Sequence, residues 1–151
     1  PDVGGGRIVG EACHFIDLLR HLAGAPIVER TVRGVAASAA RERDVSIMLG
    51  FADGSHGTIH YLSSGNRGFP KERLDVFCAG HVLSLGNFRV LRGWGFHGFS
   101  NKRSLAQDKG QRGCARAFLD AVASGGPMPI PIDELLEVSR TSILAQGEAR
   151  A

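Results

Sequence analysis

Two histidines and an aspartate lie on one face of the first predicted helix. Residues 4–17 read Gly-Gly-Gly-Arg-Ile-Val-Gly-Glu-Ala-Cys-His-Phe-Ile-Asp, a glycine run that opens into an amphipathic segment. His14, Asp17 and His21 follow one another at i, i+3 and i+7, and a helix brings such positions to the same side. A histidine beside a carboxylate on a rigid element is typical of acid/base catalysis. The predicted core side of this helix carries Val9, Cys13, Ile16 and Leu19 or Leu22.

A metal site is a second interpretation of this face. Glu11 and His14 form a Glu-x-x-His pattern, which recurs in di-iron helical bundles. Such a site needs a second copy of the pattern and two further glutamates, and the sequence contains neither these nor an HExxH motif. We therefore expect no metal, and we expect His21 to lie at the surface or to serve packing.

The glycine run does not match the phosphate-binding fingerprint of dinucleotide-binding domains. Val9 occupies the last glycine position of G-x-G-x-x-G, and no strand precedes the run. We expect Gly5 and Gly6 to form a close-packed turn against a cofactor or a substrate. The chain alone is not expected to bind NAD tightly.

Composition indicates one soluble globular domain without nucleic-acid or membrane partners. The chain has 151 residues, 43% of them hydrophobic and 22% charged, and a net charge of +3 that is scattered along the sequence. Nucleic-acid binding usually needs a concentrated basic patch, and a membrane span needs about 18–20 apolar residues in a row. Three distant cysteines without a CxxC spacing favour the reducing cytoplasm, with Cys13 and Cys78 in the core.

The hydrophobic pattern changes from helical to alternating and back to helical along the chain. Helices are predicted over residues 9–22, 114–124 and 132–146, the first of them ended by Gly24 and Pro26. Alternating or β-branched runs predict antiparallel strands over residues 27–35, 44–52, 57–62, 73–78, 82–85 and 88–91. This order predicts an α+β fold with one large, mostly antiparallel, open β-sheet and helices on one face.

Residues 93–112 lose all periodicity and are rich in glycine, aromatic and basic residues. Long loops of this kind often bind ligands. Trp94, His97 and Lys109 would supply an aromatic platform and donors for a sugar or a nucleotide-sugar phosphate. The alternative is that the loop packs on its own domain or on a partner subunit.

The order and spacing of several segments resemble the glucose–fructose oxidoreductase, inositol dehydrogenase and rhizopine-catabolism (Gfo/Idh/MocA) family. Gly5-Gly6 followed by His14 and Asp17 resembles the start of that family's second domain. The remaining matching segments extend to the end of the chain and include residues 57–59, 69–77, 108–110, 117–122 and 129–131. Residues 69–77 are similar to a subgroup of two-domain oxidoreductases from polysaccharide gene clusters.

This resemblance implies that residues 1–151 are a single C-terminal domain, of the dihydrodipicolinate-reductase-like kind, cut from a longer protein. The N-terminal Rossmann domain, which binds NAD or NADP and supplies the family's lysine, is absent from the chain. The family reaction transfers a hydride between nicotinamide and a sugar or cyclitol carbon. His14 would be the acid/base group, with Asp17 or Glu11 orienting its ring, and the isolated chain would be inactive. The open sheet, over residues 44–62 and 73–91, would pair with another copy.

Two departures from the family pattern keep a second function open. The family's aspartate four residues before the histidine falls at Gly10, and Gln111 stands where the subgroup often has histidine. Glu11 is the nearest carboxylate, rotated by about a hundred degrees on a helix, and it lies within reach of His14. The alternative is a non-catalytic module of the same fold that binds a carbohydrate or holds subunits together.

Overall fold

The computed structural model describes residues 6–34 and 44–150, which divide into two compact units. The first unit comprises the described residues up to Ser64 together with those from Pro127 onward, and the second unit spans Gly65–Gly126. No helix within these described ranges is long and apolar enough to cross a membrane.

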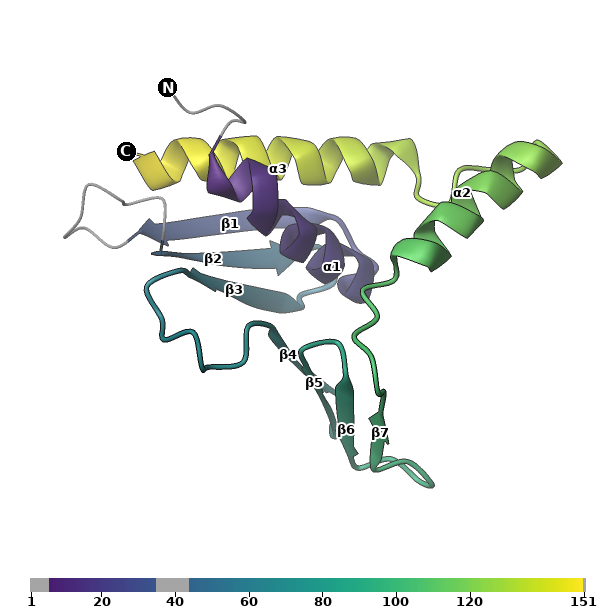
Figure 1. The fold of residues 1–151 in the computed structure, drawn as a ribbon. Helices are drawn as coiled ribbons and strands as arrows, with labels where there is room; N and C mark the ends of the chain where they lie inside the picture. Colours follow the sequence, from purple (N-terminus) through teal and green to yellow (C-terminus); the bar gives the residue numbers. More distant parts are fainter. Residues whose placement is uncertain (1–5, 35–43, 151) are drawn as a thin grey trace. The chain divides into compact units, whose positions relative to one another are not determined.

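A three-stranded antiparallel sheet forms the centre of the first unit. Its strands are β1 (Ile27–Gly34), β2 (Asp44–Phe51) and β3 (His56–Leu62), in the order β1-β2-β3. The opening helix η1 (Ile8–Ala12), its continuation α1 (Cys13–Ala23) and the C-terminal helix α3 (Ile132–Arg150) lie over one face of this sheet (Figure 1). The tight turn between β2 and β3 is confirmed, with Gly54 at φ +84° and Asp53 accepting the Ser55 N–H at 3.0 Å.

The alternation predicted for β2 defines the core. The inward side chains of β2 are all at most 4% exposed: Val45, Ile47, Leu49 and Phe51. In register with them, Val32 of β1 pairs with Ile47, and Ile47 pairs with Ile59 of β3, so one face of the sheet is continuously apolar. The helices complete the core with small and branched side chains: Ile8, Ala12, Ile16, Val138, Ala145 and Ala149.

The first helix buries a different stripe from the predicted one. Its fully or nearly buried positions recur every four residues: Ile8, Ala12, Ile16 and Arg20. The prediction was right for Ile16 but wrong for Leu22, which is 48% exposed, and Val9, Cys13 and Leu19 are only half-buried. The reason is that η1 is a π-helical turn, whose wider spacing changes which residues face the sheet. Gly24, at φ +65°, ends the helix as predicted.

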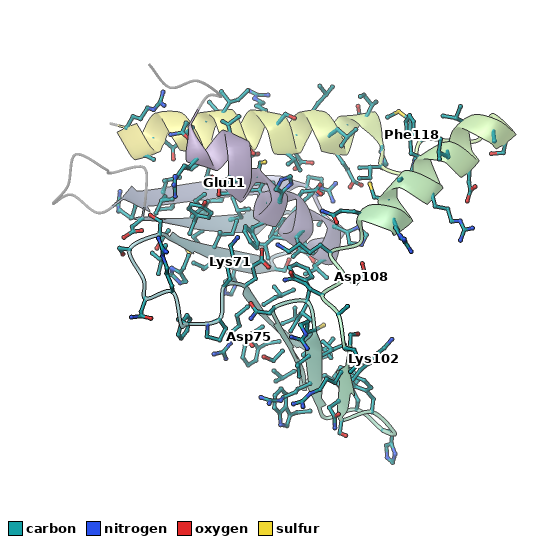
Figure 2. The ribbon with its side chains drawn as sticks, viewed as in Figure 1. Glu11, Lys71, Asp75, Lys102, Asp108 and Phe118 are labelled. Atoms are coloured by element: carbon teal, nitrogen blue, oxygen red, sulfur yellow. The ribbon has the colours of Figure 1, made fainter. Side chains whose placement is uncertain are left out.

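A four-stranded antiparallel meander forms the second unit. The strands β4 (Arg73–Cys78), β5 (His81–Gly86), β6 (Val90–Trp94) and β7 (Asn101–Arg103) pair in sequence order. Helix α2 (Gln111–Ser124) follows and buries none of its residues. Phe118, labelled in Figure 2, is 59% exposed on this helix.

The α+β class with antiparallel strands is confirmed, and four details differ from the expectation. The strands form two sheets instead of one large sheet. Asn87 and Phe88, both at positive φ, make the turn before β6, so this strand starts at Val90. The aperiodic stretch contains β7, whose Asn101 pairs with Arg92; three residues are too few for a periodic signal. Cys78, predicted in the core, is exposed at the end of β4.

Candidate functional site

His14 and Asp17 lie on α1 one turn apart, as their spacing predicts. The His14 side chain is exposed and Asp17 is half-buried. Among the described residues, neither side chain makes a hydrogen bond to the other or to Glu11. His14 is therefore accessible to a ligand on a rigid helix, and its orientation by Asp17 or Glu11 stays a prediction.

Glu11 has a partner on another element that its sequence motif does not contain. The phenolic hydroxyl of Tyr61, on β3, donates a hydrogen bond to the Glu11 carboxylate on η1, a residue labelled in Figure 2. Burial, followed by this hydrogen bond and the Glu11 charge, raises the pKa of Tyr61, and Arg7 partly opposes these effects. The alternation of β3 carried the missing signal, because Tyr61 follows Ile59 at a spacing of two and so faces the helices.

Gly6 is packed against the C-terminal helix. A Cβ at this position would lie 2.4 Å from the Gln146 Oε1, and the residue has a φ of +96°. The same oxygen accepts the Ile8 N–H at 3.0 Å, so the buried Gln146 amide fixes the point where the helix begins. The requirement for glycine here is explained by the chain's own packing, and a cofactor contact at Gly6 stays a prediction. Gly5, the other predicted cofactor contact, lies outside the described residues.

Substituting Gly6 by alanine should cost more stability than the same change at Gly24. Both glycines have positive φ, but nothing lies within 4 Å of a Cβ at Gly24. Gly24→Ala should lower the free energy of unfolding by about 1 kcal/mol through backbone strain alone. Gly6→Ala adds an overpacking term and should cost about 2–3 kcal/mol. Urea unfolding of both variants measures the difference, and equal losses would show that the Gln146 contact does not constrain the turn.

A partly buried ion pair ties the helix that carries His14 to α3 and β1. Arg20 is 8% exposed, and its Nε donates to Glu137 Oε2 at 2.9 Å, while Glu134 lies at 3.7 Å. The second oxygen of Glu137 accepts the backbone N–H of Ile27, the first residue of β1. Because these bonds join three elements of one unit, they hold α1 in one position on the sheet.

The predicted substrate contacts belong to the second unit. The Lys109 ammonium lies 2.7 Å from Glu72 Oε1 and 5.8 Å from the centre of the Phe88 ring. Trp94 ends β6 with 52% of its surface exposed, and His97 is exposed in the following turn. Lys109 thus anchors the chain before α2 within its own unit. A substrate-binding role for Lys109, Trp94 and His97 stays a prediction.

A metal site is the second interpretation of the residues on the first helix. Within residues 6–34 and 44–150, no group of three or more His, Cys, Asp or Glu side chains is placed to hold a metal ion. The three cysteines are free thiols.

The similarity of this chain to known proteins is structural. No protein-family model matches the sequence, and no curated protein matches it. A UDP-N-acetylglucosamine 3-dehydrogenase from Acidithiobacillus ferrooxidans has a similar structure. The match covers 97% of this chain and 48% of the dehydrogenase, with a TM-score of 0.76 and 18% sequence identity. An oxidoreductase from Agrobacterium radiobacter, in complex with NAD+, L-tartaric acid and magnesium, is also similar. The match covers 93% of this chain and 46% of that protein, with a TM-score of 0.72 and 17% sequence identity. An aldose–aldose oxidoreductase from Caulobacter crescentus, complexed with glycerol, is a third similar structure. The match covers 91% of this chain and 43% of that protein, with a TM-score of 0.69 and 15% sequence identity.

These similarities define the fold of the chain. The chain spans about half the length of the solved oxidoreductases that it matches. It has the α+β fold of one half of a dehydrogenase, so the family resemblance seen in the sequence is confirmed at the level of fold. At 15–18% identity, these similarities establish the fold alone.

Proposed function

We propose that this chain is the C-terminal, substrate-binding half of an NAD(P)-dependent oxidoreductase that acts on a sugar, a nucleotide sugar or a cyclitol. The observation that carries the proposal is the exposed His14 on a helix that the Arg20–Glu137 pair and the Gly6–Gln146 contact hold in place. The shared fold with sugar-related oxidoreductases supports it. A rigidly held, accessible histidine suits an acid/base role.

In this role His14 moves one proton at the substrate hydroxyl. When the alcohol is oxidised, an imidazole nitrogen of His14 accepts the hydroxyl proton while the carbon gives up its hydride. In the reverse direction His14 returns the proton to the carbonyl oxygen. Asp17 and Glu11, within three residues on either side, would stabilise the imidazolium that forms. A nicotinamide, bound by another domain, would accept or donate the hydride.

The proposal includes a second domain and a second copy of the protein. An N-terminal Rossmann domain would hold the NAD or NADP, which fits a chain that covers about half of the matching oxidoreductases. The isolated chain, a single C-terminal domain in this view, would then be inactive. The sheet face away from the helices carries exposed Met48 and Leu62, which supports pairing with another copy. The cytoplasm would keep the three thiols reduced.

Reduction of nicotinamide by candidate alcohols tests this proposal. The complete protein that contains this chain is mixed with NAD+ or NADP+ and with UDP-N-acetylglucosamine, an aldose or a cyclitol, and the absorbance of the reduced cofactor is followed. We expect substrate-dependent reduction with at least one of these classes, and none with the isolated chain. A complete protein that neither reduces NAD(P)+ nor oxidises NAD(P)H with the corresponding ketones would contradict the proposal.

A non-catalytic module of the same fold is the second candidate. Two observations favour it: Gly10 stands where the family has an aspartate, four residues before His14, and Lys109 is already paired with Glu72. Such a module would bind a carbohydrate or hold subunits together without turnover. Carbohydrate binding by calorimetry in the absence of any nicotinamide turnover would favour this candidate over the enzyme.

A further inference from the structure

Two polar side chains, Tyr61 and Glu11, meet where the first helix begins. The Tyr61 hydroxyl donates to Glu11, and Arg7 lowers the pKa of Tyr61 against the effect of the Glu11 charge. Arg7 and Tyr61 are half-buried, whereas Glu11 is exposed. The phenol therefore holds an otherwise mobile carboxylate at one position on the surface.

This carboxylate sits in the π-helical turn, three residues before His14. Residues at that spacing lie on neighbouring positions of a helix surface. Single π-turns within helices occur frequently at functional sites, because they change the direction of nearby side chains. Here the turn gives Glu11 a partner on β3, a strand far from it in the sequence. Since Tyr61 donates to Oε2, Oε1 stays available for a donor on His14 or on a ligand.

We propose that Tyr61 is a positioning residue which fixes the Glu11 carboxylate beside His14. This inference rests on the proposed function, because it assigns Glu11 to the acid/base site. A fixed carboxylate stabilises the protonated form of a neighbouring imidazole better than a mobile one, since it loses less freedom when the charge develops. Tyr61 acts through Glu11 and does not touch the substrate.

The contact itself can be measured without any activity, because Tyr61 is the single tyrosine of the chain. The chain is prepared with ring-labelled tyrosine, and the Cζ resonance is followed by NMR at neutral pH. Glu11→Gln should shift this resonance, because it removes the charged acceptor. Asp17→Asn, a matched change on the same helix, should leave it in place. A resonance that responds equally to both changes, or to neither, would overturn the inference.

The positioning role is measured in the complete protein with its nicotinamide cofactor. Tyr61→Phe removes only the hydroxyl and should lower kcat by about ten- to a hundredfold, with a smaller change in KM. Glu11→Gln should give a similar loss, and the double variant should be no slower than the slower single variant, because both act through one carboxylate. A purely structural role would instead lower the melting temperature and leave kcat unchanged in the folded fraction.

The outcomes separate this inference from the proposed function. If the wild-type protein turns over alcohols and Tyr61→Phe is equally fast, the positioning role is overturned and the proposed function stands. If the wild type has no dehydrogenase activity, both are overturned, even where the NMR response confirms the contact between Tyr61 and Glu11.

Discussion

His14→Gln is expected to lower kcat/KM for alcohol oxidation by about 10²–10⁴-fold, the usual contribution of a general acid/base group. Glutamine keeps a polar side chain of similar length but cannot accept the hydroxyl proton. His21→Gln is the matched control, because His21 is also an exposed histidine on α1. Steady-state kinetics of the complete protein measure both variants.

The two variants should have the same stability, because neither side chain is part of the core. A large loss of activity in His14→Gln at an unchanged melting temperature therefore reports on chemistry. Equal activities of His14→Gln, His21→Gln and wild type would remove His14 from the catalytic site.

Glu137→Ala should lower the free energy of unfolding by about 3–5 kcal/mol, the cost of leaving a buried charge without its partner. Arg20 would retain only Glu134, at 3.7 Å, and the Ile27 N–H would lose its acceptor. Denaturant unfolding followed by circular dichroism measures the change. Since the pair positions α1, the variant should also lose activity under conditions where it remains folded.

Glu148→Ala on the same helix is the control for this loss. Glu148 pairs with Arg30, but its side chain is 43% exposed, so its removal should cost about 1 kcal/mol or less. If both variants lose the same amount, the Arg20–Glu137 pair is no more important than a surface ion pair, and another contact must hold α1.

The strictly alternating strand β2 and its buried face could be predicted from the sequence, whereas the short strand β7 and the buried face of α3 could not. Val45, Ile47, Leu49 and Phe51 alternate without exception, and all four are buried. Strand β7 has three residues, which show no period. The buried face of α3 includes Thr141, Ser142 and Gln146, whereas Leu136 and Ile143 are each 61% exposed. Because Val138, Ala145 and Ala149 are buried on the same helix, apolar residues lie on both sides of α3, and its pattern does not identify the buried face.

The candidate site could be predicted only as far as neighbours on one helix. The spacing of Glu11, His14 and Asp17 placed them together, because helical geometry is local. Tyr61 lies 50 residues from Glu11 and Gln146 lies 138 residues from Ile8, and such contacts depend on how the elements pack. The π-turn is also invisible in the residue pattern, and it is the reason that the predicted core stripe was displaced.

Rescue of a His14→Gly variant by added imidazole tests the central claim most directly. Glycine leaves space at the surface of α1, and free imidazole can take the place of the missing ring as a proton acceptor. The account predicts that the variant of the complete protein is nearly inactive in alcohol oxidation and regains activity in a saturable way as imidazole is added. A His14→Gly variant with wild-type activity in the absence of imidazole would contradict the assignment of His14 as the acid/base group.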